Sequence, residues 1–66
     1  MSQCNSEGVA EFIRLIEELR DFIDDMNGYE KTFMYDQSDR AERFGDKLRV
    51  TETQLEFARK LYAEYL

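Results

Sequence analysis

The 66-residue chain contains no histidine, proline or tryptophan, and Cys4 is its one cysteine. Without histidine, the chain lacks the commonest general base and the commonest metal ligand. A single cysteine provides neither a disulfide within the chain nor a cysteine–histidine zinc site. The serines have no histidine to activate them as nucleophiles. We therefore expect a protein that is not an enzyme and that uses no cofactor or structural metal.

Long apolar runs are also absent from the sequence. No segment approaches the roughly 20 apolar residues that a membrane-spanning helix requires. Residues 1–8 are polar and lack the apolar core of a signal peptide. A lone cysteine is typical of a reducing compartment. We expect a cytoplasmic protein without a membrane anchor, located in the host cytoplasm if a phage encodes it.

Glycine is scarce, and two of the three glycines, Gly28 and Gly45, fall where the apolar periodicity stops. Glycine tolerates the backbone conformations that end helices. The pattern predicts an all-α fold, either a small three-helix bundle or a helical hairpin with a third helix. The expected helices cover approximately residues 7–26, 30–44 and 52–66. The length allows one domain, 1–66, in which we expect residues 1–6 to be a flexible N-terminus.

The 7–26 helix carries apolar residues at intervals of seven. One series is Val9, Ile16 and Ile23, and the other is Phe12, Leu19 and Met26. Such heptads are typical of a helix that packs along a seam. Asn5 or Ser6 is suited to cap the start of this helix, and Asn27-Gly28 to end it through a left-handed residue. The seam predicts packing within a bundle or a homodimer through this helix.

The other two helices differ in how clearly they are marked. The 30–44 helix has an apolar stripe if Gln37 takes the intervening position, and its other members are Tyr29, Phe33, Met34, Ala41 and Phe44. Asp36–Asp39 favours a break, so a split into 30–35 and 39–45 stays open. The 52–66 helix begins with a capping box, Thr51–Gln54, because a threonine is followed three residues later by a glutamine. Val50 and Leu55 flank this box as a hydrophobic staple.

Charge is distributed unevenly along the chain. Residues 1–30 carry eight acidic and two basic side chains, a net charge of −6, whereas residues 31–66 carry seven of each. The whole formal charge of −6 therefore belongs to the region of the 7–26 helix. Such a surface repels nucleic acid and attracts a basic partner. Its last turns contain Asp21, Asp24 and Asp25, which oppose the negative end of the helix dipole unless basic residues of the 30–44 helix neutralise them.

Two pairs of carboxylates lie three residues apart, Glu18 with Asp21 and Asp39 with Glu42, so each pair shares a helix face. Two facing pairs of this kind are able to hold Mg²⁺. The spacing resembles the E-x-x-E…E-x-x-D pattern of all-α nucleotide pyrophosphohydrolases, which implies a four-helix unit and metal-dependent hydrolysis. Because neither pair is flanked by the polar residues that a nucleotide needs, we interpret these carboxylates as solvated surface.

A basic cluster lies near the predicted corner between the second and third helices. It consists of Arg40, Arg43, Lys47 and Arg49. Residues 51–65 resemble the first helix of some helix-turn-helix units, which implies DNA binding. The chain as a whole is acidic, with a pI of about 4.5, unlike such domains. We expect no direct contact with nucleic acid, and we expect the cluster to pair with the acidic end of the 7–26 helix.

The candidate partner-binding residues fall into two groups. The first group is acidic and the second contains a methionine and a tyrosine: Glu17, Glu18, Asp21, Asp24, Asp25, Met34 and Tyr35. At helical spacing, Tyr29 and Phe33 are expected in the core, and Met34 and Tyr35 are expected to point away from it. An exposed tyrosine beside a methionine is typical of binding surfaces.

Two functions fit these expectations. In the first, the acidic helix imitates phosphates and the chain inhibits a nucleic-acid-handling protein as a decoy, through a basic surface of that partner. In size, charge and lack of chemistry, the chain resembles small acidic phage proteins that block restriction or CRISPR machinery. In the second, the heptad seam joins two copies, and the chain is a structural or regulatory adaptor.

Overall fold

The structure, a computed structural model, describes residues 3–66 apart from the side chain of Asp46. Its three α-helices are α1 (Ser6–Leu19), α2 (Gly28–Phe44) and α3 (Glu52–Tyr65). Short 3₁₀ helices, η1 (Arg20–Asp25) and η2 (Gly45–Lys47), follow α1 and α2. The predicted all-α fold of three helices is confirmed. Within residues 3–66, no helix has the length and apolar character needed to cross a membrane.

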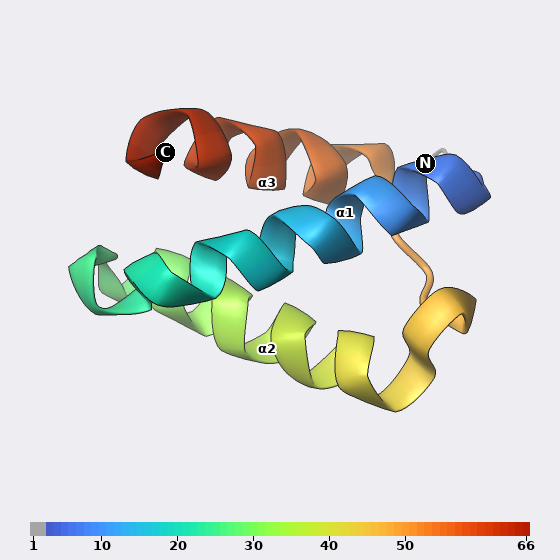
Figure 1. Cartoon of the computed structure of the whole chain (residues 1–66), viewed down its shortest axis with the longest axis horizontal. Coiled ribbons are helices and arrows are strands. Elements are labelled where there is room, and N and C mark those ends of the chain that lie inside the picture. Colours follow the sequence, from blue (N-terminus) through green and yellow to red (C-terminus); the bar gives the residue numbers. More distant parts are fainter. Residues whose placement is uncertain (1–2) are drawn as a thin grey trace.

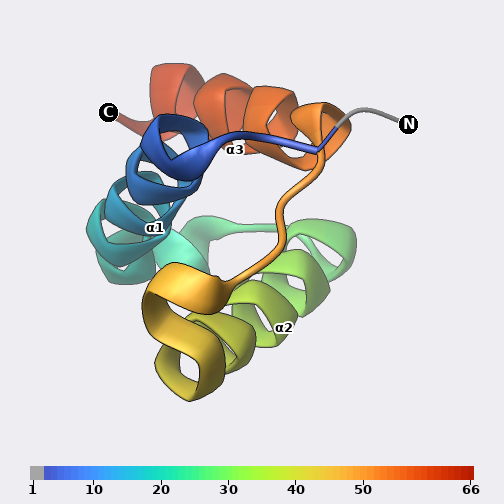
Figure 2. The ribbon, with the colours of Figure 1, turned by 90° about the vertical axis from the view of Figure 1, so that its right-hand side faces the viewer.

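α1 lies between the other two helices and contacts both of them (Figure 1). In the view turned by 90°, the three helices occupy the corners of a triangle (Figure 2). The molecule measures 30 × 22 × 18 Å along its principal axes. Because α1 and α2 run antiparallel, η1 and η2 lie at opposite ends of the longest axis (Figure 1).

Five of the six heptad-seam residues are buried inside the chain's own core, and the sixth, Ile23, is half-buried against it. Val9, Phe12, Ile16, Leu19 and Met26 are each at most 8% exposed, and they cluster with buried residues of α2 and α3. Burial of each such side chain contributes roughly 1.5–3 kcal/mol to folding. An association of two copies through this helix would therefore have only Ile23 of the seam and residues outside it, and the oligomeric state stays a prediction.

The expected helix over 7–26 is interrupted in the structure. The α-helix ends at Leu19, and η1 continues as a 3₁₀ helix to Asp25, a tightening that is frequent at the C-termini of α-helices. The chain then turns at Met26, which has extended backbone angles (φ −86°, ψ 155°) and a buried side chain. Asn27 also has extended angles, so the predicted left-handed stop at Asn27-Gly28 is wrong.

Asn27 instead begins the next helix. Its side chain accepts a hydrogen bond of 2.8 Å from the backbone N–H of Glu30, whose carboxylate accepts the N–H of Asn27 at 3.2 Å. This capping box starts α2 two residues earlier than expected. α2 runs without a break through Asp36–Asp39 and ends at Phe44. Gly45 caps it as the one residue with positive φ (53°) in the described chain.

The predicted starts of the other two helices are confirmed. Asn5 caps α1 by accepting the N–H of Gly8 at 2.9 Å, and Thr51 and Gln54 form the reciprocal capping box of α3. The segment expected to be flexible, 1–6, falls partly outside the described residues. Its described part is held by specific contacts: Gln3 forms an isolated antiparallel bridge with Thr51, and the N–H of Cys4 donates to Val50 at 2.8 Å.

Candidate functional site

The five acidic candidates form a continuous stretch from the second half of α1 to the end of η1. We call them the acidic surface: Glu17, Glu18, Asp21, Asp24 and Asp25. All five side chains are exposed. Of these five carboxylates, only Glu18 forms an ion pair with a side chain that the structure describes, and its partner Arg14 is 3.8 Å away. An exposed i,i+4 pair of this kind contributes roughly 0.3–0.5 kcal/mol, so the surface stays strongly negative.

The 3₁₀ geometry of η1 brings like charges together. In a 3₁₀ helix, side chains three residues apart eclipse one another. Asp21 and Asp24 are therefore stacked along the axis, separated by about 6 Å for three residues that each rise ~2.0 Å. Neither α1 nor η1 has a basic residue in its last turn to offset these carboxylates. The chain thus holds a row of negative charges in a fixed arrangement at its surface.

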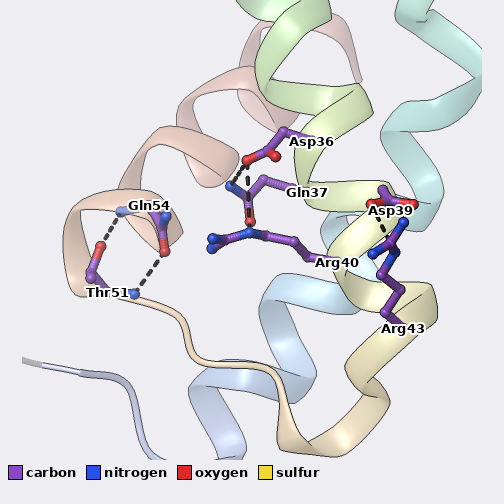
Figure 3. A network of polar contacts seen from close by, with 7 residues as sticks. All are labelled: Asp36, Gln37, Asp39, Arg40, Arg43, Thr51 and Gln54. Atoms are coloured by element: carbon purple, nitrogen blue, oxygen red, sulfur yellow. Dashed lines mark hydrogen bonds and ion pairs between the residues drawn. The ribbon is translucent and has the colours of Figure 1, made fainter.

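The expectation that the basic cluster neutralises this surface is wrong for both of its arginines on α2. Nε of Arg40 lies 3.9 Å from Asp36, and Nε of Arg43 lies 3.1 Å from Asp39, so both arginines pair within their own helix (Figure 3). The physical reason is local, because Asp36 and Asp39 each lie one turn before an arginine on the same face of α2. One ion pair does join η1 to α2, between Arg20 and Glu42, with N and O atoms 3.4 Å apart.

Met34 does not belong to an exposed surface. It is 0% exposed and forms part of the core, whereas its neighbour Tyr35 is 60% exposed, as expected. The inward stripe of α2 follows Glu30, Met34 and Gln37, which are all buried. The sequence pattern assigns Gln37 to this stripe correctly, but it misses the polar Glu30 and wrongly includes Phe44, which is 55% exposed. The signal available was the N-x-x-E capping box at Asn27, which fixes Glu30 at the helix start.

The aromatic residues expected in the core of α2 lie near its edge instead. Tyr29 is 76% exposed, and its ring stands edge-on to Phe57 of α3 with centroids 5.7 Å apart. Phe33 is half-buried between Phe57 and Phe12, at 4.7 and 6.2 Å. These contacts join α2 to α3 and to α1, and they account for much of the aromatic content of the chain.

The two carboxylate pairs are not assembled into a metal site. Glu18 pairs with Arg14, Asp39 with Arg43, and Glu42 with Arg20. In the part of the chain that the structure describes, no group of three or more histidine, cysteine or acidic side chains is placed to hold a metal ion. The arrangement implied by the pyrophosphohydrolase-like spacing is thus absent from residues 3–66.

A polar cleft of about 470 Å³ lies between the start of α1 and α3, and Cys4 and Arg59 are among its lining residues. Arg59 donates two hydrogen bonds to Glu11, at 2.6 and 2.8 Å. These bonds lower the pKa of Glu11 below its ordinary value and raise that of Arg59. The best-formed ion pair of the chain therefore joins α1 to α3, away from η1.

We compared the chain with known protein families, with curated proteins and with solved structures, and none of these comparisons found a match. The fold and the charged surface define a small all-α three-helix protein with an acidic row on α1 and η1.

Proposed function

We propose that the chain is a non-enzymatic protein-binding module that inhibits a nucleic-acid-handling protein as a decoy. The observation that supports this proposal is the acidic surface. Five exposed carboxylates extend over α1 and η1, and the one ion pair among them is weak. A chain that placed them only for solubility would gain stability by setting basic residues at the end of the helix, where the dipole favours them.

The chemistry of the partner follows from the charges. Proteins that handle nucleic acid bind phosphates through arginine and lysine side chains. Carboxylates held on a helical frame are acceptors for the same donors, so they compete with phosphates for a basic channel. Their field also steers the encounter with such a partner. Tyr35, exposed on α2, is a candidate additional contact of the kind that anchors interfaces.

The alternative function, an adaptor that pairs through the heptad seam, has less support. Five of the six seam residues are buried within one copy of the chain, and the partly buried Ile23 is the one seam residue with an accessible side chain. We therefore base the proposal on charge and not on an apolar interface.

The proposal is tested by DNA cleavage with purified restriction nucleases and Cas9–guide complexes in the presence of increasing amounts of the chain. The test variant carries Glu17→Gln, Asp21→Asn, Asp24→Asn and Asp25→Asn. We expect the wild-type chain to inhibit at least one of these enzymes and the variant to inhibit it at least tenfold more weakly. Inhibition should also weaken steeply with salt, because exposed charges are screened within about 8 Å at 0.15 M.

A matched control removes the same number of charges elsewhere on the chain. Glu7, Glu52, Glu56 and Glu64 are exposed and lie outside the acidic surface, and each is changed to glutamine. This control should inhibit nearly as well as the wild-type chain. Equal potency of the two variants, or no inhibition of either enzyme class, would contradict the proposal.

A further inference from the structure

A second charged surface lies at the opposite end of the molecule from η1, where the chain turns from α2 toward α3 (Figure 1). A pocket of about 330 Å³ opens there. We call its lining the basic corner: Arg40, Phe44, Lys47, Leu48 and Arg49. Among the side chains that the structure describes, every charged residue in this lining is basic, although the chain carries a net charge of −6.

The cations of the basic corner are largely free to meet a ligand. Lys47 and Arg49 are exposed and form no ion pair with any side chain that the structure describes. Arg40 is 3.9 Å from its carboxylate partner, at the outer limit of an ion pair, and both side chains are about half exposed. Because no described carboxylate pairs with Lys47 or Arg49, these two residues give the corner its positive charge.

An aromatic ring lies among these cations. Phe44, the last residue of α2, is 55% exposed, whereas Leu48 beneath the pocket is 4% exposed. Gly45 has φ 53° and ψ −128°, which is strained for residues other than glycine, and it turns the chain into η2 directly after Phe44. The turn therefore places Lys47 and Phe44 around the same pocket and leaves the ring uncovered.

We propose that the basic corner binds an unstacked nucleotide, with the base on the ring of Phe44 and the phosphate on Lys47 and Arg49. Sites for single-stranded nucleic acid combine aromatic rings with cations in this way, because every base has a face on which a ring can stack. The pocket is at the small end of the range for ligand sites, roughly 300–1,000 Å³, which suits one nucleotide. A free nucleotide and a nucleotide within a single strand share this chemistry.

The net negative charge of the chain does not prevent such binding. Asp21, Asp24 and Asp25 are on η1, at the other end of an axis 30 Å long (Figure 1). At physiological ionic strength, exposed charges are screened over about 8 Å, so the local charge of the corner governs the encounter. This proposal uses none of the residues of the acidic surface, so its failure and the failure of the decoy proposal are separable.

The test is fluorescence anisotropy with two labelled probes, a single-stranded decathymidylate and adenosine monophosphate, at 50–200 mM salt. Phe44→Ala should weaken binding about tenfold, the loss typical of one stacked base. The double variant Lys47→Gln, Arg49→Gln should reduce the slope of log affinity against log salt by about 0.7, since both cations contact one phosphate and each neutralised phosphate of a single strand contributes ~0.7. Circular dichroism checks that each variant remains folded.

Matched controls use residues of the same type outside the pocket. Tyr29→Ala removes an exposed aromatic residue of α2, and Lys60→Gln removes an exposed cation of α3. Both should bind as the wild-type chain does. Tighter binding of the decathymidylate than of the mononucleotide would identify a single strand as the ligand. Equal affinities for the two probes would identify a free nucleotide as the ligand. No binding at millimolar protein, no effect of Phe44→Ala, or equal binding of a polyglutamate peptide would overturn the proposal.

Discussion

The hydroxyl of Tyr65, in the last turn of α3, donates a hydrogen bond of 2.7 Å to Oε1 of Glu30 at the start of α2. The same oxygen accepts the N–H of Asn27, so one buried carboxylate both closes the capping box and joins α3 to α2. The ring of Tyr65 also packs against Phe22 of η1, with centroids 6.3 Å apart. This contact fixes the position of η1, and with it the carboxylates of the acidic surface.

Tyr65→Phe should lower the melting temperature by several degrees. It should also reduce the loss of folding stability that accompanies a rise in pH above 10. The hydrogen bond to Glu30 raises the pKa of Tyr65 to about 12 from an ordinary 10. Because the folded pKa is the higher one, the stabilisation is complete below pH 10 and is lost as the pH rises from 10 to 12. Thermal unfolding at pH 8 to 11.5 measures this loss.

The control for this prediction is Tyr29→Phe, since the Tyr29 side chain is 76% exposed. It should keep the wild-type dependence on pH, whereas Tyr65→Phe should depend on pH less steeply. If all three proteins lose stability in parallel, the hydrogen bond to Glu30 does not contribute.

The Glu11–Arg59 pair predicts that part of the folding stability is lost at acidic pH. The two hydrogen bonds from Arg59 lower the pKa of Glu11 from 4.5, so this pair stabilises the fold above pH 4.5 and the effect is lost as the pH falls through the folded pKa. Glu11→Gln should therefore lose less stability between pH 5 and pH 3 than the wild-type chain. Urea unfolding over this range checks the difference, which should be modest and should shrink in high salt.

Glu18→Gln is the matched control, because its partner Arg14 is 3.8 Å away and both are on the same helix. This variant should lose almost as much stability as the wild-type chain between pH 5 and pH 3. A larger effect for Glu18→Gln than for Glu11→Gln would contradict the assignment of this stability loss to the bond between α1 and α3.

Gly45→Ala should destabilise the fold by about 1–3 kcal/mol through backbone strain alone. Gly45 has φ 53°, and an added Cβ would meet no atom within 4 Å, so sterics at the side chain are not involved. Gly28→Ala is a paired control: its Cβ also has open space, and its φ is not positive. It should stabilise the chain by about 0.4–1 kcal/mol. Chemical denaturation of the two variants should show opposite signs.

Met34→Ala should leave the chain largely unfolded. Truncation of a buried methionine costs about 2–5 kcal/mol, which is comparable to the ~3–5 kcal/mol that a core of this size supplies. Met34→Leu keeps the volume and should cost less than about 1.5 kcal/mol. Tyr35→Ala should change stability little, because Tyr35 is exposed. Far-ultraviolet circular dichroism during urea unfolding distinguishes the three variants, and equal losses for Met34→Ala and Tyr35→Ala would contradict the register of α2.

The sequence alone was sufficient to predict the caps of α1 and α3 and the buried seam of α1. These features depend on local hydrogen bonds and on a strong apolar period, both of which are visible in the chain. Asn5, Thr51 and Gln54 have the partners expected from their spacing. The continuity of α2 was undecided because Asp and Ser favour breaks only weakly, and tertiary contacts override such preferences.

The predicted inward face of α2 was wrong for a different reason. Glu30 is buried because Tyr65, 35 residues later in the chain, supplies a hydrogen bond for its carboxylate. A pattern based on hydrophobicity places such a residue outside, and it then moves Met34 outside as well. The pairing of Arg40 and Arg43 within α2 was also missed, although it can be read from the sequence, since each arginine follows an aspartate by four residues.

The central claim is that one copy of the chain uses its apolar seam internally, which leaves charge as its means of recognition. Light scattering at low and high salt tests this claim most directly. The account predicts a mass of 7.9 kDa, that of one chain, at 0.5 M salt and no apolar association at any concentration of salt. A dimer that persists at 0.5 M salt would contradict the account and would favour an adaptor that pairs through an apolar surface.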